Sequence, residues 1–551
     1  MIYLLPHAVD TVASSHPDRV AFSCLQEHLT YEQLATRSNR LAVFLLADGV
    51  LPGERVGICL PRSLESVVAV FGILKAGAVY VPIDPLAPRP VVEGILRHCG
   101  IRHLIAAHRS SDILQQIING GNTPLESVIG SLSLPGPVRT SPWATVEQAS
   151  GGAAPDIRIS ELDLAYIMYT SGSTGSPKGI MHTHYSGLSY ARLSAATYGI
   201  HPDDRIANHS PLHFDMSTLG YFTAPTAGCT TVIIPEAHTR MPASLSTLME
   251  DERVTVWYSV PLALTQMLHQ GALENRKLTS LRWVLFGGEP FPPRPLYELM
   301  RLWPQAQFSN VYGPAEVNQC TFYHLPPQVP DASDPVSQQP IPLGEIWPDT
   351  EALVLDETDQ PVGAGQSGEL VVRSPTMMQG YWARPDLNAR AFFTREVFPN
   401  FTKTFYRTGD LVRLGEDLQL HFIGRKDRQI KLRGYRIDLD DVEHALAFHE
   451  AVAEAAVYVY SDVEGGDERL AAAVIPRPGM APDSTKIMAF LATRLPPQAL
   501  PGRLFIRNTF PLTGTGKIDR NALRKETQAE LASGGEPPSQ DPQISARIHE
   551  T

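Results

Sequence analysis

The chain has few cysteines, no excess of positive charge and no long uninterrupted apolar run. Five cysteines among 551 residues stand apart from one another, and no two form a Cys-x-x-Cys pair. This spacing argues against a zinc site or a disulfide framework, and it fits a reducing compartment. The net charge of −12 argues against nucleic acid or an anionic membrane surface as the main partner.

Signals for export or membrane insertion are also lacking. The N-terminus has neither the basic flank nor the apolar run of a signal peptide. The most apolar stretch, Val67–Ile83, is interrupted by Lys75 and by glycines, so it predicts a helix and then a strand rather than a membrane span. We therefore expect a cytoplasmic protein with no membrane partner.

What the chain does have is enough apolar sequence for several cores. Its length exceeds one ordinary domain, with 43% hydrophobic and 19% charged residues. Helical and strand patterns alternate early, with a helix predicted over Ser63–Lys75 and a strand over Val79–Ile83. Residues 131–160 are rich in Pro, Gly and Ser and predict a connecting loop. Residues 341–423 predict a subdomain of short strands.

The pattern changes again after residue 424, where a compact α+β unit is predicted. The fold class is therefore α/β, with a large N-terminal domain of α/β layers and a β-rich subdomain, and a small mobile α+β C-terminal domain. We place these domains at residues 1–424 and 425–525. Residues 526–551, rich in Gly, Pro, Ser, Gln and Glu, predict a disordered tail.

The most informative segment is LAYIMYTSGSTGSPKGI at residues 164–180. A short buried strand, Leu164–Met168, leads into a loop of Ser, Thr and Gly that ends in Pro-Lys-Gly. Glycines let successive N–H groups form an anion-binding nest, hydroxyls add donors, and Lys178 adds positive charge. The Walker spacing of Gly-x4-Gly-Lys is absent. The segment therefore predicts a polyphosphate-binding loop that is not a Walker loop.

This loop and further motifs in order resemble the adenylate-forming enzymes, which include acyl-CoA synthetases, firefly luciferase and the adenylation domains of nonribosomal peptide synthetases. The resemblance covers roughly residues 10–525, and stand-alone amino-acid-adenylating enzymes are the most similar members. The further motifs are LTYEQL (29–34), LKAGAVYVPID (74–84), FDMS (214–217), NVYGPAE (310–316), GEL (368–370), YRTGDL (406–411), GRKDRQIKLRGYRIDLDDVE (424–443) and GTGKIDR (514–520).

The resemblance implies ATP and Mg²⁺ and assigns residues to them. Glu316 would hold the metal, Tyr312 would stack on adenine, and Asp410 and Arg425 would lie at the ribose and phosphates. Lys517 would be the catalytic lysine between the α-phosphate and the substrate carboxylate. The phosphate cradle would comprise Thr170, Ser171, Gly172, Ser173, Thr174, Gly175 and Lys178. Ala315 departs from the family, where a Thr commonly contacts the α-phosphate.

The resemblance also implies the class of acid that is activated. Asp215 matches the Asp that pairs with the ammonium of an amino acid, and a buried carboxylate facing an ammonium leaves neither charge unpaired. The other residues that align with the substrate pocket carry no charge at neutral pH, so we expect a neutral amino acid. Met216, Leu219 and Tyr258 are bulky and reduce the volume of the pocket, so we favour a small aliphatic amino acid such as alanine. The uncharged residues that align with the pocket are Met216, Leu219, Tyr258, Leu285, Gly287, Val311, Gln319 and Cys320.

The acceptor is expected in trans, because no carrier segment follows residue 525 and no condensation domain precedes residue 10. It would be the phosphopantetheine thiol of a separate carrier protein, with free coenzyme A as the alternative. The small domain would rotate about Asp427 and Arg428 between two half-reactions, with Gly434 facing the thiol. Three alternatives stay open: a β-amino acid as substrate, an acyl- or aryl-CoA ligase of the same fold, and an inactive nucleotide-binding relative.

Overall fold

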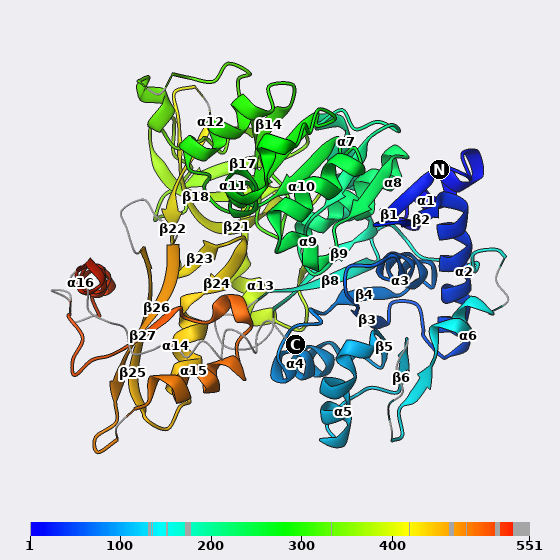
Figure 1. The fold of residues 1–551 in the computed structure, drawn as a ribbon, viewed down its shortest axis with the longest axis horizontal. Helices are drawn as coiled ribbons and strands as arrows, with labels where there is room; N and C mark the ends of the chain where they lie inside the picture. Colours follow the sequence, from blue (N-terminus) through cyan, green and yellow to red (C-terminus); the bar gives the residue numbers. More distant parts are fainter. Residues whose placement is uncertain are drawn as a thin grey trace. The chain divides into compact units, whose positions relative to one another are not determined.

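The computed structural model describes residues 2–130, 134, 136–149, 152–170, 178–331, 333–417, 419–461, 468–480, 482–512 and 518–532. The described chain forms two compact units. The first contains the residues up to 427 together with 433–436, and the second contains 428–432 and the residues from 437 onward. Figure 1 colours the chain from blue at the N-terminus to red at the C-terminus.

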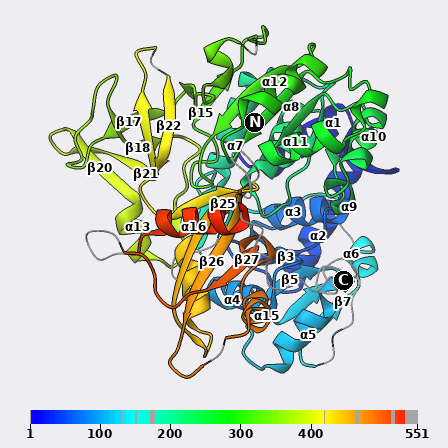
Figure 2. The ribbon, with the colours of Figure 1, turned by 60° about the vertical axis from the view of Figure 1, so that its left-hand side comes forward.

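One sheet of the first unit has the described strand order β19-β9-β8-β4-β3-β5-β6-β7. Strand β4 sends Tyr80 into one hydrophobic core and Val79 and Val81 into another, as the twofold period of a strand requires. Helices α2 (Tyr31–Ala47) and α3 (Leu64–Lys75) cover the first face, and α4 (Arg89–Cys99) and α5 (Ser111–Asn119) the second (Figures 1 and 2). The strands are β3 (Arg55–Cys59), β4 (Val79–Pro82), β5 (His103–Ala106), β6 (Ser127–Ile129), β7 (Arg139–Ser141), β8 (Leu164–Thr170), β9 (Lys178–Thr183) and β19 (Gly380–Tyr381).

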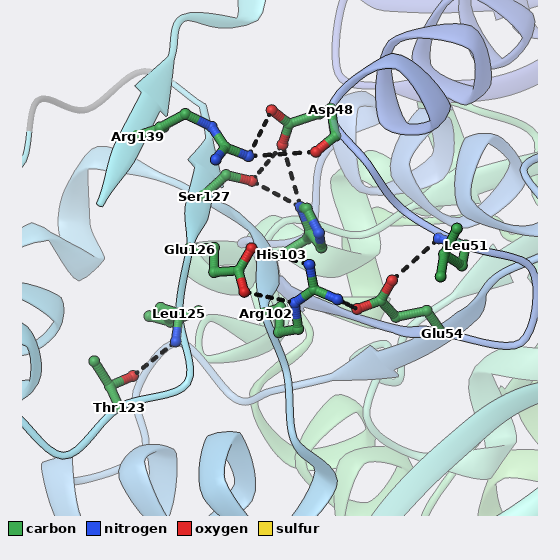
Figure 3. A network of polar contacts seen from close by, with 10 residues as sticks. All are labelled: Asp48, Leu51, Glu54, Arg102, His103, Thr123, Leu125, Glu126, Ser127 and Arg139. Atoms are coloured by element: carbon green, nitrogen blue, oxygen red, sulfur yellow. Dashed lines mark hydrogen bonds and ion pairs between the residues drawn. The ribbon is translucent and has the colours of Figure 1, made fainter. Parts of the chain in front are cut away.

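A polar network closes the amino ends of β5, β6 and β7, as Figure 3 shows. Asp48, which ends α2, accepts hydrogen bonds from Ser127 Oγ (2.6 Å) and Arg139 Nη2 (3.0 Å). The buried ring of His103 lies with Nδ1 2.9 Å from Ser127 Oγ. Although Ser, His and Asp meet here, they lie at the amino ends of parallel strands, opposite to the edge where α/β sheets bind ligands. We interpret the network as structural.

The second sheet has the described order β16-β15-β14-β13-β12-β10-β11-β1-β2. Strand β12 sends Trp257 into a core formed with α10, α11 and α12, and Val256 and Tyr258 into another core beneath α7 (His184–Thr197). The strands are β1 (Val20–Cys24), β2 (Glu27–Thr30), β10 (Arg205–Asn208), β11 (Thr230–Ile233), β12 (Val256–Ser259), β13 (Trp283–Gly287), β14 (Gln307–Tyr312), β15 (Thr321–His324) and β16 (Glu345–Ile346). The further helices of this unit are α1 (Pro6–Ser15), α6 (Trp143–Glu147), α8 (Ala224–Ala227), α9 (Glu236–Thr239), α10 (Pro242–Asp251), α11 (Pro261–Gln270), α12 (Pro293–Leu302) and α13 (Pro385–Ala391).

A third, antiparallel sheet follows, and it confirms the predicted β-rich subdomain. Its described order is β17-β18-β21-β20, and β22 pairs with β21. The strands are β17 (Glu351–Leu355), β18 (Ser367–Arg373), β20 (Phe392–Phe398), β21 (Phe401–Leu414) and β22 (Leu420–Arg425).

The second unit is a small α+β body around the sheet β25-β26-β27. Within it Arg428 donates to both carboxylate oxygens of Glu443 and pairs with Asp440, which ties the start of the unit to α14. Its elements are α14 (Leu439–Ala447), β25 (Val452–Ser461), β26 (Glu468–Pro476), α15 (Ser484–Ala492), β27 (Arg503–Ile506) and α16 (Arg520–Ala532), with β23 (Gln429–Leu432) before them. The residues of β24 (Tyr435–Asp438) are divided between the first unit and the second.

The structure corrects two predictions from composition. The segment 131–160 was expected to be a loop, but it contains β7 and α6, since β7 extends the sheet beside β6 and Val146 is buried. The tail was expected to be disordered from residue 526, but α16 continues to Ala532. Leu523 is fully buried in the core of the second unit, and Thr527 hydrogen-bonds Tyr458. Residues 533–551 lie outside the described part of the chain.

No helix in the described residues is both long and apolar enough to cross a membrane.

Candidate functional site

Several of the residues that align with the substrate pocket lie at or after the ends of four neighbouring parallel strands. β10, β12, β13 and β14 lie side by side in that order. Tyr258 is the penultimate residue of β12, Gly287 ends β13 and Val311 is the penultimate residue of β14. Asp215 follows the carboxyl end of β10 in the chain. The carboxyl edge of a parallel sheet is where α/β folds bind ligands, so the fold brings these positions to one such edge.

The apolar part of this group forms one hydrophobic core cluster. Leu219, Tyr258, Leu285 and Val311 are buried together, and Met216 packs against them. Leu219 begins a π-helical turn, η3 (Leu219–Thr223), a distortion often found at functional sites.

Gly287 and Val311 are directly paired across β13 and β14, and a Cβ at Gly287 would lie 2.2 Å from the Val311 carbonyl oxygen. The glycine is therefore needed for the two strands to approach.

Asp215 is half-buried and lies close to three buried tyrosines. Burial is the main cause that raises the pKa of Tyr166, Tyr190 and Tyr258, and the Asp215 carboxylate contributes to the rise for each. Asp215 stands in a short 3-10 turn, η2 (Asp215–Ser217), and its Oδ1 accepts from the Met216 N–H (2.9 Å). A carboxylate in this setting is suited to a cationic group such as an ammonium.

Gln319 and Cys320 follow β14 and are both buried. Gln319 Nε2 donates to the hydroxyl of Tyr198 (2.7 Å), and Cys320 Sγ lies 3.6 Å from the Tyr312 carbonyl oxygen. Each is held by another part of the first unit.

Three of the residues assigned to the nucleotide are joined directly. Both oxygens of Asp410, which is 1% exposed, accept hydrogen bonds: Oδ2 from the Tyr312 hydroxyl and Oδ1 from Arg425 Nη1, each at 2.5 Å. Arg425 also donates to Asp427 (2.6 and 2.8 Å). The cluster therefore places a paired carboxylate and a guanidinium where β21 and β22 meet.

Glu316 is almost fully buried and is held by two donors. Arg436 Nη1 lies 2.9 and 2.8 Å from its two carboxylate oxygens, and the Tyr381 hydroxyl donates to Oε1 (2.6 Å). Burial alone would raise the pKa of Glu316, but Arg436 and Tyr381 outweigh it and hold the pKa at about 2. The carboxylate is thus ionised at any physiological pH.

The surroundings of Glu316 fit Mg²⁺ only if substrate phosphates and water provide the other ligands of the ion. Among the described residues, no three His, Cys, Asp or Glu side chains gather as a metal-binding group. Mg²⁺ is often bound by one or two carboxylates together with substrate phosphates and water. Glu316 could supply one hard oxygen ligand, and its ion pair with Arg436 shows that its surroundings accept a cation.

Of the residues expected to form a phosphate cradle, the structure describes only the two at the ends. Thr170 and Lys178 pair across β8 and β9, and Lys178 is buried. Ser171, Gly172, Ser173, Thr174 and Gly175 lie outside the described residues, and so does Lys517.

Four residues of this region were not singled out from the sequence. Tyr190 comes from α7, Asn318 from the segment after Glu316, and Tyr381 and Arg436 surround Glu316. Arg436 lies in the recognised segment 424–443, so its charge was a usable signal. The tyrosines and Asn318 offered none, because their importance comes from contacts between distant segments.

The chain matches two family models. Residues 9–382 match the model described as AMP-binding enzyme, and residues 441–517 match its C-terminal domain. It is 32% identical over 513 residues to an L-proline–[L-prolyl-carrier protein] ligase of Pseudomonas fluorescens, covering 93% of this chain and 97% of that protein. It is 34% identical over 541 residues to a dimodular nonribosomal peptide synthase of Bacillus subtilis, covering 97% of this chain and 22% of that synthase.

The fold matches a solved structure of the same architecture. The amide bond synthetase McbA of Marinactinospora thermotolerans superposes with a TM-score of 0.82 at 24% identity, covering 95% of this chain and 99% of McbA. At that identity the likeness supports the fold alone.

Proposed function

This chain belongs to the AMP-binding enzyme family, and on that premise we propose that it activates a small neutral amino acid with ATP and transfers it to the phosphopantetheine thiol of a separate carrier protein. The match to this family and the similarity to a carrier-protein ligase make the chain an adenylate-forming ligase. The substrate, the acceptor and the residue roles given below are our proposal.

The observation that carries the proposal is the position of Asp215. Its carboxylate lies near three buried tyrosines and next in the chain to Met216, at the edge of an apolar cluster. An amino acid would place its ammonium against Asp215 and a small uncharged side chain against the cluster. A fatty or aryl acid has no ammonium group that could pair with the Asp215 carboxylate.

The proposed reaction has two steps. First, an oxygen of the substrate carboxylate attacks the α-phosphorus of ATP, the bond from that phosphorus to the bridging oxygen breaks, and pyrophosphate leaves. Then the carrier's sulfur attacks the acyl carbon, the acyl–oxygen bond breaks, AMP leaves, and the thiol proton passes to solvent. A bound Mg²⁺ would lower the charge repulsion between phosphate oxygens.

The residues of the chain would divide this work. Lys178 and the cradle would hold the phosphates, and Glu316 would hold Mg²⁺. Asp410 would accept hydrogen bonds from the ribose, with Arg425 beside it and Tyr312 against adenine. Lys517 would offset the charge that develops as two anions approach.

The relative that ligates L-proline adds one candidate to alanine. Proline is also small, uncharged in its side chain and cationic at nitrogen, so it meets the same requirements. A β-amino acid and transfer to coenzyme A are the alternatives.

Amino-acid-dependent exchange of labelled pyrophosphate into ATP tests the substrate class. The panel is L-alanine, L-proline, β-alanine, L-glutamate, L-lysine, benzoate and octanoate. We expect exchange with a small neutral amino acid and none with benzoate or octanoate. Exchange with benzoate or octanoate alone would refute the substrate class.

A further inference from the structure

Asn318 links the segment after Glu316 to the turn that carries Asp215. Its side-chain Nδ2 donates to the hydroxyl oxygen of Thr218 (2.9 Å). That hydroxyl in turn donates to the main-chain carbonyl oxygen of Asp215 (2.5 Å). Asn318 and Thr218 are both buried. Two consecutive hydrogen bonds therefore run from Asn318 to the backbone of Asp215, of which the first is buried and the second partly buried.

The same two side chains also reach the tyrosines around the Asp215 carboxylate. Burial and the Asp215 carboxylate raise the pKa of Tyr166, and the Asn318 side chain opposes that rise. The Thr218 side chain likewise opposes the rise in the pKa of Tyr190. Asn318 and Thr218 are therefore bonded to the turn that carries Asp215, and they also affect two of the tyrosines whose pKa the Asp215 carboxylate raises.

The backbone conformation at position 318 could by itself account for the asparagine. Asn318 has a left-handed backbone, with φ of +59°, which asparagine tolerates better than most residues. The surrounding loop is tight, since a Cβ at Gly313 would lie 2.4 Å from the Asn318 carbonyl oxygen. Glycine at position 318 would suit this backbone and remove only the amide.

We propose that Asn318 is a positioning residue for the substrate's ammonium, which acts by holding Thr218 and the Asp215 turn in place. The proposal rests on the proposed function, in which Asp215 pairs with the ammonium. It assigns to Asn318 a part in choosing amino acids over acids without an amino group. Asn318 itself need not touch the substrate.

The test compares Asn318→Gly with Asn400→Gly, a matched variant. Asn400 also has a left-handed backbone, with φ of +65°, but it is exposed in the turn between β20 and β21. The assay is pyrophosphate exchange with two pairs of probes: L-alanine with propionate, and L-proline with cyclopentanecarboxylate. Within each pair the second acid lacks the amino nitrogen.

For Asn318→Gly we expect the KM for the amino acid to rise about tenfold, since buried hydrogen bonds are lost, while the KM for ATP stays within about twofold. The preference for the amino acid over its nitrogen-free partner should fall by the same factor. Asn400→Gly should match the wild type. If Asn318→Gly also matches it, or if both KM values rise together, asparagine serves only the backbone and the inference is wrong.

Thr218 provides a second test that does not depend on the left-handed backbone. Thr218→Val removes the hydroxyl at nearly constant volume and should reproduce the loss, whereas Thr218→Ser should restore most of the preference. A Thr218→Val enzyme with unchanged preference would overturn the inference. The failure of the proposed function is distinguishable, because Asp215→Asn would then also leave the preference unchanged.

Discussion

At the scale of residues, the site is organised around carboxylates that already have partners. Glu316 is paired with Arg436 and Tyr381, and Asp410 with Tyr312 and Arg425. Buried carboxylates without such partners would be protonated or strongly destabilising. The pairs therefore keep two negative charges available at positions where we propose that Mg²⁺ and ribose bind.

The Glu316–Arg436 pair should be coupled in stability. Glu316→Gln and Arg436→Gln should each lower the free energy of unfolding by about 3 kcal/mol, because each leaves its partner uncompensated. The double variant should lose clearly less than the sum of the two. Urea denaturation of the four proteins measures this. Strictly additive losses would mean that the two side chains do not interact.

The same pair predicts a response to acid. The pKa of Glu316 in the folded chain is about 2, below the ordinary value of 4.5. A depressed carboxyl pKa gives stability that is complete above the ordinary value and is lost as the pH falls through the folded value. Glu316→Gln should therefore flatten the fall in unfolding free energy between pH 4.5 and 2, measured by urea denaturation at fixed ionic strength. An unchanged acid limb would contradict the ion pair.

Lys517 is the residue whose loss should affect the chemistry most. Because it is proposed to stabilise charge in the transition state, Lys517→Ala should cut the exchange rate by orders of magnitude and change ATP affinity much less. Exchange kinetics together with equilibrium ATP binding separate these effects. Near-normal exchange would show that Lys517 has no catalytic role.

The sequence could indicate many of these residues but few of their partners. Asp215, Glu316 and Asp410 stand in recognisable motifs. Arg436 stands in one too, yet its pairing with Glu316 joins residues 120 apart in sequence. Asn318 and Tyr190 have ordinary neighbours, so only the folded chain shows that both come near Asp215.

At the scale of elements, capping residues and local sequence patterns predicted helices and strands well where these patterns agreed with the packing of the folded chain. Ser63 caps α3 through a hydrogen bond from the Ser66 N–H, as its type suggests, and both α3 and β4 lie close to their expected bounds. Composition failed for β7 and α16, because a polar or glycine-rich segment becomes ordered when a neighbour buries a few of its side chains.

The approach of β13 to β14 should depend on the glycine at position 287. A Cβ there would lie 2.2 Å from the Val311 carbonyl oxygen, so the strands must shift in Gly287→Ala. We expect a loss of about 1–3 kcal/mol in unfolding free energy and a fall in exchange activity. Gly363→Ala is the control, since nothing lies within 4 Å of its added Cβ. Equal effects of both substitutions would argue against the close strand contact.

At the scale of the whole molecule, buried histidines set a limit on acid stability. Burial lowers the pKa of His182 and of His184 to about 4 each, so both stay neutral in the folded chain while the unfolded chain protonates them below about 6.5. The unfolded state then binds more protons, and stability falls as the pH drops.

As the pH falls from 6.5 to 4, these two histidines together should lower the free energy of unfolding by roughly 3 kcal/mol per pH unit. Replacing His184 by Asn, whose amide oxygen can still accept from the Leu5 N–H, should reduce the slope by about half of that. Urea denaturation at pH 7, 6 and 5 measures the slopes. An unchanged slope in the variant would mean that His184 is not held neutral.

Loading of a carrier protein tests the central claim most directly. The enzyme is incubated with ATP, Mg²⁺, the amino acid selected by the exchange panel and a phosphopantetheinylated carrier protein, and the intact mass of the carrier is measured. We predict that the carrier gains the mass of one aminoacyl group in a thioester that hydroxylamine cleaves, and that Asp215→Asn abolishes this gain. An enzyme that loads no carrier in a panel of holo-carriers but converts coenzyme A into an aminoacyl or acyl thioester would contradict the account.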